Sequence, residues 1–170
     1  NDGPGQSQTV MVTATDLSGA VSNTTFQLSV NNVVPVVAVS GPVSTLAGTA
    51  VNFTLGATDI SSADQAAGFT YQIDWDGDGS VDQTVSGADG LVVGHSFALA
   101  GLTNVIVTAT DKDGGTSSPV THSILVLQPV NIDVKPDSRQ NKVNVKSQGV
   151  IPVAILTTAG FDATTVIGSS

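Results

Sequence analysis

Apolar and polar residues alternate in short stretches along much of the chain. In residues 51–55 the apolar side chains are Val51, Phe53 and Leu55, and polar residues separate them. Residues 70–75 divide in the same way, with Tyr71, Ile73 and Trp75 on one face and Thr70, Gln72 and Asp74 on the other. Strict alternation is typical of a β-strand with one buried and one solvated face. We therefore expect an antiparallel sheet whose buried face carries the apolar residues of these stretches and whose solvated face carries the polar ones.

Seven such stretches lie between residues 33 and 128, and residues rich in Gly, Ser and Asp separate them. Their ranges are 35–41, 50–57, 69–75, 80–85, 91–97, 103–110 and 120–127. Short strands with frequent turn signals are typical of an antiparallel β-sandwich, and hardly any residues follow a helical pattern. The predicted fold class is all-β, with Ig-like antiparallel β-sandwich modules in tandem, one complete and two partial.

The stretch from Val10 to Gly19 returns 95 positions later, from Val105 to Gly114. Both copies have the form V-x-V-x-x-x-D-x-x-G, and a second strand-like run follows each, at 24–30 and 121–127. A strand, an Asp/Gly turn and a returning strand predict a β-hairpin. A spacing of about 95 residues is the size of one Ig-like sandwich. The two hairpins should therefore be the same part of two successive units.

This repeat divides the chain into three parts. Residues 1–31 should be the C-terminal hairpin of a preceding Ig-like repeat, and residues 32–128 a complete sandwich. Residues 129–170 read as the N-terminal part of a further β module, with strands expected at 130–135, 142–146 and 150–158. This last part holds four of the five basic residues: Lys135, Arg139, Lys142 and Lys146.

Composition narrows the functions that need to be considered. Val (26) and Thr (20) are the commonest residues, and both are β-branched, which favours strands over helices. All 14 acidic residues are aspartate, only five residues are basic, and the net charge of −9 argues against nucleic-acid binding. The absence of cysteine excludes disulfides and thiolate zinc sites. No run of 18 apolar residues occurs, so we expect no insertion into a membrane.

Two motifs give the middle part its resemblance to a known family. They are "YQIDWDGDGSVD" at residues 71–82 and "HSFALAGLTNVIVTATDKDGG" at residues 95–115. In this register the chain resembles the PKD domain, an Ig-like sandwich repeat of secreted and cell-surface proteins. Gly77 and Asp78 depart from the family, which most often has Phe-Gly after the Trp-Asp pair. Residues 1–31 are similar to the closing strands of PKD or HYR-type repeats, and residues 129–170 to a C-terminal module of secreted bacterial repeat proteins.

The aspartate-rich loop after Trp75 has the spacing of a calcium-binding loop. Counted from Asp74, the ligand positions 1, 3, 5, 7 and 9 are filled by Asp74, Asp76, Asp78, Ser80 and Asp82. Gly79 at position 6 would allow the sharp turn that such loops need. Position 12 is valine rather than glutamate, and the flanking elements are strands, so the loop is not an EF-hand. Two further ligands could come from the preceding loop, Asp59 and Asp64. The alternative is that Asp and Gly are here only as hairpin-turn residues.

Other chemistry-bearing residues have structural interpretations. Asp111 has a counterpart in the first repeat, Asp16, whereas Ser18 stands at the position of Asp113. We therefore expect Asp111 and Asp113 to form a turn. His95 and His122 have no second histidine or cysteine nearby, and we expect both to be half-buried strand residues. Crowded aspartates on a turn differ from the paired carboxylates of a hydrolase cleft, and neither a catalytic triad nor a phosphate loop is present. The sequence therefore predicts no enzymatic activity.

These observations favour a non-enzymatic structural or adhesive spacer of a large secreted or cell-surface bacterial protein, stabilised by Ca²⁺. Its partners would be neighbouring β modules of the same protein, with surface glycans or proteins as further candidates. Two alternatives remain: an accessory carbohydrate-binding module of a secreted hydrolase, and a subunit of an extracellular filament assembled by strand exchange. A carbohydrate-binding module would need a planar row of exposed aromatic residues.

Overall fold

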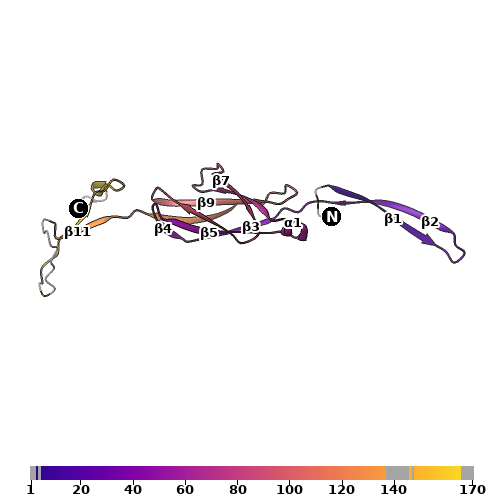
Figure 1. Ribbon diagram of the computed structural model, residues 1–170, viewed down its shortest axis with the longest axis horizontal. Coiled ribbons are helices and arrows are strands. Elements are labelled where there is room, and N and C mark those ends of the chain that lie inside the picture. The colour runs from indigo at the N-terminus through magenta and orange to yellow at the C-terminus, as the bar shows by residue number, and fades with distance from the viewer. Residues whose placement is uncertain (1–2, 4, 137–145, 147, 166–170) are drawn as a thin grey trace.

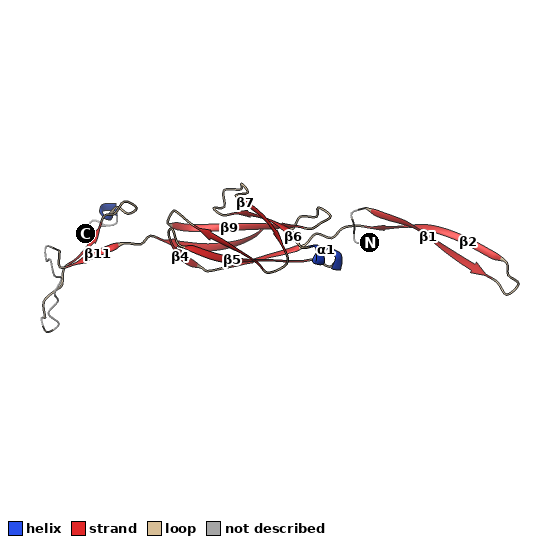
Figure 2. Ribbon diagram, viewed as in Figure 1, coloured by secondary structure: helices blue, strands red, loops and turns tan. Residues whose placement is uncertain are grey.

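A computed structural model describes residues 3, 5–136, 146 and 148–165 of the chain. Figure 1 shows an elongated arrangement in which a β-hairpin, a β-sandwich and a small C-terminal unit follow one another along the long axis. Strands dominate all three parts, as the colouring in Figure 2 shows. The predicted all-β fold class is confirmed.

The sandwich consists of two sheets. One has three strands in the order β3-β5-β8, with bounds Val36–Ser40, Ala50–Thr58 and Leu91–Ser96. The other has five strands in the order β4-β10-β9-β6-β7, with bounds Ser44–Leu46, Val120–Leu127, Gly101–Thr110, Phe69–Asp74 and Gln83–Gly87. Only β4 runs parallel to its neighbour, β10, and every other pair in the two sheets is antiparallel.

The core lies between the two sheets and is made by the faces that the alternation predicted. Phe53, Leu55, Tyr71 and Ile73 are fully buried, and Trp75 is 4% exposed. Each fully buried large apolar side chain contributes about 1.5–3 kcal/mol relative to an exposed one. The Tyr71 hydroxyl donates to the Ala88 carbonyl at 3.4 Å, and burial, together with the nearby Asp89 carboxylate, raises its pKa to about 12.

The structure differs from the sequence prediction at four places in the sandwich. A short helix, α1 (Ser62–Ala67), lies where we expected only a loop. Ser61 caps it by accepting a hydrogen bond from the Asp64 N–H at 3.2 Å. The short strand β4 was not predicted, and β7 begins at Gln83 because residues 80–82 belong to the preceding turn. Asp74, expected on the solvated face, is only 6% exposed.

The N-terminal hairpin consists of β1 (Gln6–Thr15) and β2 (Val21–Val30), which pair along their whole length. The predicted hairpin is therefore present, but nearly all its side chains are exposed.

The C-terminal unit contains β11 (Asn131–Val134), β12 (Val153–Leu156) and the 3₁₀ turn η1 (Ala163–Thr165). β11 and β12 fall within the predicted strands 130–135 and 150–158 and pair antiparallel. Most of the strand expected at 142–146 lies outside the described residues, as do Arg139 and Lys142.

Candidate functional site

The aspartate loop connects β6 to β7 and begins at Asp74, the last residue of β6. Each of Asp74, Asp76 and Asp78 offers a carboxylate oxygen, and these three atoms lie within 4.8 Å of one another. Asp74 is buried, whereas Asp76 and Asp78 are exposed. The structure thus brings together three of the five residues of the predicted loop as an oxygen-rich, negatively charged cluster, which is the ligand chemistry that Ca²⁺ prefers.

Hydrogen bonds from the backbone hold the Asp74 carboxylate. Its Oδ1 accepts from the Gly77 N–H at 2.6 Å and its Oδ2 from the Gly79 N–H at 2.9 Å. Desolvation alone would raise the pKa of Asp74, but hydrogen bonds from backbone N–H groups, chiefly those of Gly79 and Gly77, outweigh it and lower the pKa below the ordinary value of 3.8. Both glycines have positive φ, 75° at Gly77 and 92° at Gly79, which explains why the loop uses glycine at these positions.

The other predicted ligands have different roles. Asp76 Oδ1 accepts from the Asp78 N–H at 3.2 Å, and Asp78 Oδ1 accepts from the Ser80 N–H at 2.7 Å. Asp82 lies outside the group of three, because its Oδ2 accepts from the Trp75 N–H at 2.7 Å and so closes the base of the loop. The carboxylates of the loop therefore stabilise it through hydrogen bonds to its own backbone, and three of them are also placed where they could bind a cation.

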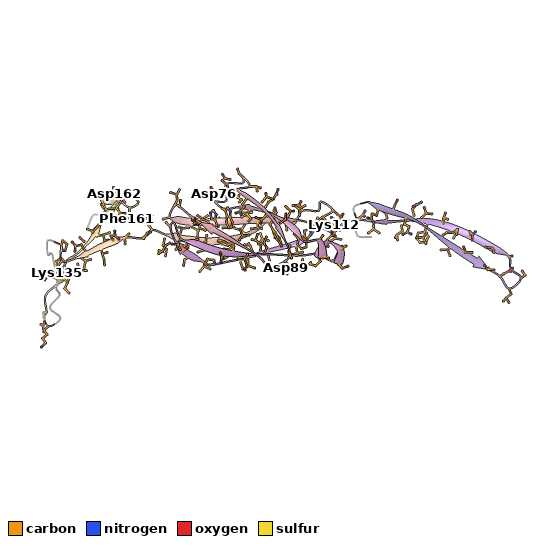
Figure 3. All side chains as sticks on the ribbon, in the orientation of Figure 1. Asp76, Asp89, Lys112, Lys135, Phe161 and Asp162 are labelled. Carbon is orange, nitrogen blue, oxygen red and sulfur yellow. The ribbon has the colours of Figure 1, made fainter. Side chains whose placement is uncertain are left out.

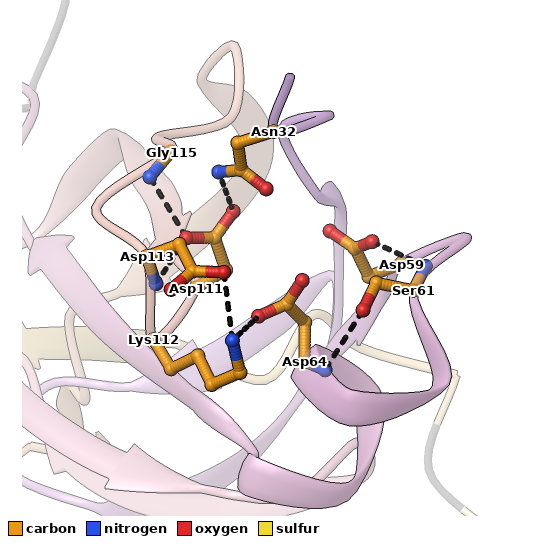
Figure 4. Close-up of polar contacts among 8 residues, drawn as sticks. All are labelled: Asn32, Asp59, Ser61, Asp64, Asp111, Lys112, Asp113 and Gly115. Atoms are coloured by element: carbon orange, nitrogen blue, oxygen red, sulfur yellow. Dashed lines mark hydrogen bonds and ion pairs between the residues drawn. The ribbon is translucent and has the colours of Figure 1, made fainter. Parts of the chain in front are cut away.

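Asp59 and Asp64 do not complete this loop, and the expectation that they would is wrong. Both residues precede β6, whereas Asp76 follows it. A strand of six residues spans roughly 20 Å, so the two ends of β6 are far apart. Figure 4 shows Asp59 and Asp64 beside Asn32, Asp111 and Lys112, and Figure 3 shows Lys112 away from Asp76.

A second polar cluster surrounds Lys112. Asp64 is fully buried, and its Oδ1 lies 3.3 Å from the Lys112 ammonium, which also contacts Asp113 Oδ2 at 2.7 Å. Lys112 is the only basic residue before Lys135. Sequence reasoning missed this pair. A buried carboxylate needs a partner of opposite charge. A single lysine in a long acidic stretch could therefore have indicated that Lys112 pairs with a buried aspartate.

The same cluster connects the linker after β2 to the sandwich. Asn32 Nδ2 donates to Asp111 Oδ2 at 2.8 Å (Figure 4). Asp111 Oδ1 accepts from the backbone N–H groups of Asp113 and Gly115 at 2.9 and 2.8 Å, so Asp111 forms the turn that the sequence predicted. A Cβ at Gly115 would lie 2.4 Å from Asn32 Nδ2 and 2.5 Å from Asp111 Oδ2. Only glycine leaves room for this contact.

The aromatic residues of the sandwich are packed inside it. The Trp75 indole stacks on the His95 ring, and its Nε1 donates to Gln83 Oε1 at 3.0 Å. A groove of about 380 Å³ beside this stack is lined by Asp76, Asp82 and Leu99 among others. Burial lowers the pKa of His95, and the Asp82 carboxylate partly opposes this shift. His95 and His122 are half-buried strand residues, as predicted, and His122 Nε2 lies 3.0 Å from the Pro42 carbonyl oxygen.

None of the helices in the described part of the chain is long and apolar enough to span a membrane.

Comparisons with known proteins give similarity only to solved structures. No protein-family model matches the chain, and no curated protein matches it. The chain is 26% identical to a PKD domain of an M14-like peptidase from Thermoplasmatales archaeon SCGC AB-540-F20, over 55% of this chain and 92% of that one, with a TM-score of 0.44. It is 20% identical to fibronectin(III)-like modules of Clostridium thermocellum CbhA, over 74% of this chain and 65% of that one, with a TM-score of 0.46. The central part of the chain is an Ig-like antiparallel β-sandwich, as the alternation of apolar and polar residues predicted. The resemblance of the motifs around Trp75 and His95 to the PKD domain stays a prediction.

Proposed function

We propose that this chain is a non-enzymatic spacer segment of a large secreted or cell-surface bacterial protein, built from Ig-like β-sandwich modules in tandem. The observation that carries the proposal is that the β1–β2 hairpin repeats the β9–β10 hairpin of the sandwich, while no sheet among the described residues covers its apolar face.

The two hairpins have the same turn. Asp16 Oδ1 accepts from the N–H groups of Ser18 and Ala20, both at 2.8 Å. The Asp111 carboxylate accepts from the residues two and four positions later at nearly the same distances. The glycines that end the two turns also match, with φ of 86° at Gly19 and 88° at Gly114.

The two hairpins also share their strand register. Gln8 pairs with Leu28 and Gln6 with Val30, just as Thr103 pairs with Ile124 and Gly101 with Val126. The equivalent apolar faces are therefore Val10, Val12, Ala14, Leu28 and Val30 in one hairpin, and Val105, Val107, Ala109, Ile124 and Val126 in the other.

Only one of these faces is covered. In β9–β10 all five side chains are at most 2% exposed, because the β3-β5-β8 sheet packs on them. In β1–β2, Val12 is 51% exposed and Leu28 46%. A two-stranded hairpin with an uncovered apolar face is at best marginally stable in water. We infer that residues 1–31 close another sandwich, whose other strands supply a sheet like β3-β5-β8.

A fusion tests this inference directly. Residues 33–100, which hold the β3-β5-β8 sheet together with β4, β6 and β7, are placed ahead of Gln6 in the full chain. The proposal expects the amides of β1 and β2 to become protected from hydrogen exchange. Val12→Asp in the fusion should abolish the protection, whereas Thr13→Asp on the opposite face should not. Unprotected β1 and β2 amides in the fusion would contradict the proposal.

A spacer of this kind agrees with the shape and charge of the molecule. The parts of the chain follow one another along one axis (Figure 1), and the net charge of −9 favours solubility. Adhesion to glycans or proteins would be a further property of such an array. Trp75, Tyr71, Phe53, Phe69 and Phe97 are all buried, so the sandwich offers no planar row of exposed aromatics from this set. This argues against the carbohydrate-binding alternative.

We further propose that Asp74, Asp76 and Asp78 bind Ca²⁺. The observation that favours it is the convergence of three carboxylate oxygens within 4.8 Å. Ca²⁺ takes six to eight oxygen ligands, so water and a backbone carbonyl near Ser80 would have to complete the shell. We therefore expect the weak affinity of extracellular modules, a Kd of about 10⁻⁴ to 10⁻³ M. Bound Ca²⁺ would neutralise the mutual repulsion of the three carboxylates and stiffen the β6–β7 tip.

A further inference from the structure

Four Asp-Gly bonds occur in the described part of the chain, at Asp76, Asp78, Asp89 and Asp113. An Asp-Gly bond is chemically labile, because the unhindered glycine nitrogen can attack the side-chain carboxyl of the preceding aspartate. The new N–C bond closes a succinimide ring, and the carboxyl OH and the amide proton leave as water, the carboxylate having first taken up a proton from the solvent. Water then opens the ring at either carbonyl and gives aspartate or isoaspartate. Isoaspartate adds one atom to the backbone and displaces the carboxylate.

In this structure the attacking nitrogen is engaged at all four bonds. Gly90 and Gly114 donate to backbone carbonyls, those of Leu55 at 3.0 Å and Asp111 at 3.3 Å. Gly77 and Gly79 differ, because both donate to one carboxylate, that of Asp74, at 2.6 and 2.9 Å. Hydrogen bonds to an ionised acceptor are stronger than those between neutral groups. Asp74 is only 6% exposed, so little water competes for these two hydrogen bonds.

The carboxyls that would be attacked also accept hydrogen bonds. Asp76 Oδ1 accepts from the Asp78 N–H, two residues on, at 3.2 Å. Asp78 Oδ1 likewise accepts from the Ser80 N–H. Ring closure at either bond would therefore break two hydrogen bonds, one at the nitrogen and one at the carboxylate.

We propose that Asp76-Gly77 and Asp78-Gly79 are latent isoaspartate sites, and that the buried Asp74 carboxylate protects both of them. The Asp74 side chain thus slows succinimide formation at both Asp-Gly bonds of this exposed loop. The protection comes from two hydrogen bonds that the Asp74 carboxylate accepts in the structure without any metal ion, although the same carboxylate is a ligand of the calcium site proposed above. It would also matter for that site, since isoaspartate at either position would dismantle the cluster of three carboxylates.

The test compares the wild-type chain with Asp74→Ala during storage at neutral pH and physiological temperature, with chelator present so that no divalent ion contributes. Peptide mapping then measures isoaspartate at each of the four bonds. We expect a several-fold rise at Asp76 and Asp78 in the variant and no change at Asp89 and Asp113, which serve as references within the same molecule. Asp16→Ala is the matched control, since it removes a turn carboxylate that guards no Asp-Gly bond. Equal accumulation at Asp76 and Asp78 in wild type and Asp74→Ala would overturn the proposal.

Two further measurements cover the case in which Asp74→Ala fails to fold. In the folded wild-type chain, the amides of Gly77 and Gly79 should be protected from hydrogen exchange, and free exchange at both would overturn the proposal. Isoaspartate at Asp76 and Asp78 should also form several-fold faster in urea than in the folded chain. If the two rates were the same, the fold would give these bonds no protection.

Discussion

The rings of Trp75 and His95 stack almost parallel, with centroids 4.2 Å apart and 8° between their planes. Phe97 meets both rings edge-on, at 6.4 Å from Trp75 and 4.7 Å from His95. The imidazole therefore lies at the edge of the aromatic core, and both it and the indole line the groove that contains Asp82. Burial penalises the charged imidazole more than the neutral one, so this position links the charge of His95 to the stability of the sandwich.

Stability should consequently depend on pH through His95. Burial lowers its pKa from 6.5, so the folded chain binds this proton less tightly than the unfolded chain does. The free energy of unfolding should therefore fall as pH drops below about 6.5, and this contribution should level off below the folded-state pKa. Thermal melts across this range should show a flatter dependence for His95→Gln. The neighbouring exposed substitution Ser96→Ala should keep the wild-type slope, and an unchanged slope in His95→Gln would contradict the assignment.

Calcium should raise the melting temperature by a modest amount. At millimolar Ca²⁺ a site with a Kd of about 10⁻⁴ M adds about 1.4 kcal/mol to the free energy of unfolding. Asp76→Asn combined with Asp78→Asn should remove the shift between calcium and chelator, because these two carboxylates are exposed to the cation and carry no core contacts. Asp16→Asn, on the distant hairpin, is the control and should keep the shift. If calcium does not change the melting temperature of the wild-type chain, the proposed calcium site is contradicted.

Replacing Lys112 with methionine should destabilise the sandwich by about 3 kcal/mol, because the fully buried Asp64 would lose its counter-charge. The double variant Lys112→Met with Asp64→Leu should recover much of this loss, since it removes the stranded charge together with its partner. Urea unfolding monitored by Trp75 fluorescence measures both effects. Lys146→Met, far from the sandwich in sequence, is the control. A double variant as unstable as the single one would show that the ion pair is not the cause.

Gly115→Ala should disconnect the linker from the sandwich. The added methyl group would collide with Asn32 Nδ2 and Asp111 Oδ2, so the bond between these two side chains cannot form. We expect a loss of about 1–3 kcal/mol and faster proteolysis at residues 31–34. Gly94→Ala is the matched control: its new Cβ would come closest to the flexible end of Asn52, at 3.3 Å, and the next atom, the Val51 carbonyl oxygen, lies 4.0 Å away. Equal protease resistance of the two variants would mean that this contact does not order the linker.

Alternation and repetition in the sequence were sufficient to predict most of the fold. Tyr71, Ile73 and Trp75 lie on the buried face because a strand with period two can bury only one set of side chains. The hairpins at 10–30 and 105–127 followed from a repeated Asp/Gly turn, whose geometry is local and therefore readable from the sequence. Helix α1 escaped prediction because it is short, and its capping pair, Ser61 and Asp64, is equally typical of a turn.

The polar contacts were harder to predict from the sequence, because they depend on which distant segments of the chain lie side by side. The spacing of Asp74, Asp76 and Asp78 predicted their convergence, since one tight turn brings them together. Asp82 has suitable spacing as well, but its carboxylate caps the Trp75 N–H, and spacing cannot distinguish these roles. Asp64 meets Lys112 only because α1 and the β9–β10 turn lie at the same end of the sandwich.

The pairing of Lys112 with Asp64 and Asp113 has a consequence for how such molecules approach one another. Lys112 is the only lysine or arginine in residues 1–134, and it forms ion pairs with Asp64 and Asp113 of its own chain. This long stretch therefore has little positive charge with which to attract a second molecule. Parallel rods of like sign repel over roughly a Debye length, about 8–10 Å in physiological salt. Lateral bundling should thus be governed by the ionic medium, weak in dilute buffer and stronger where salt screens the aspartates.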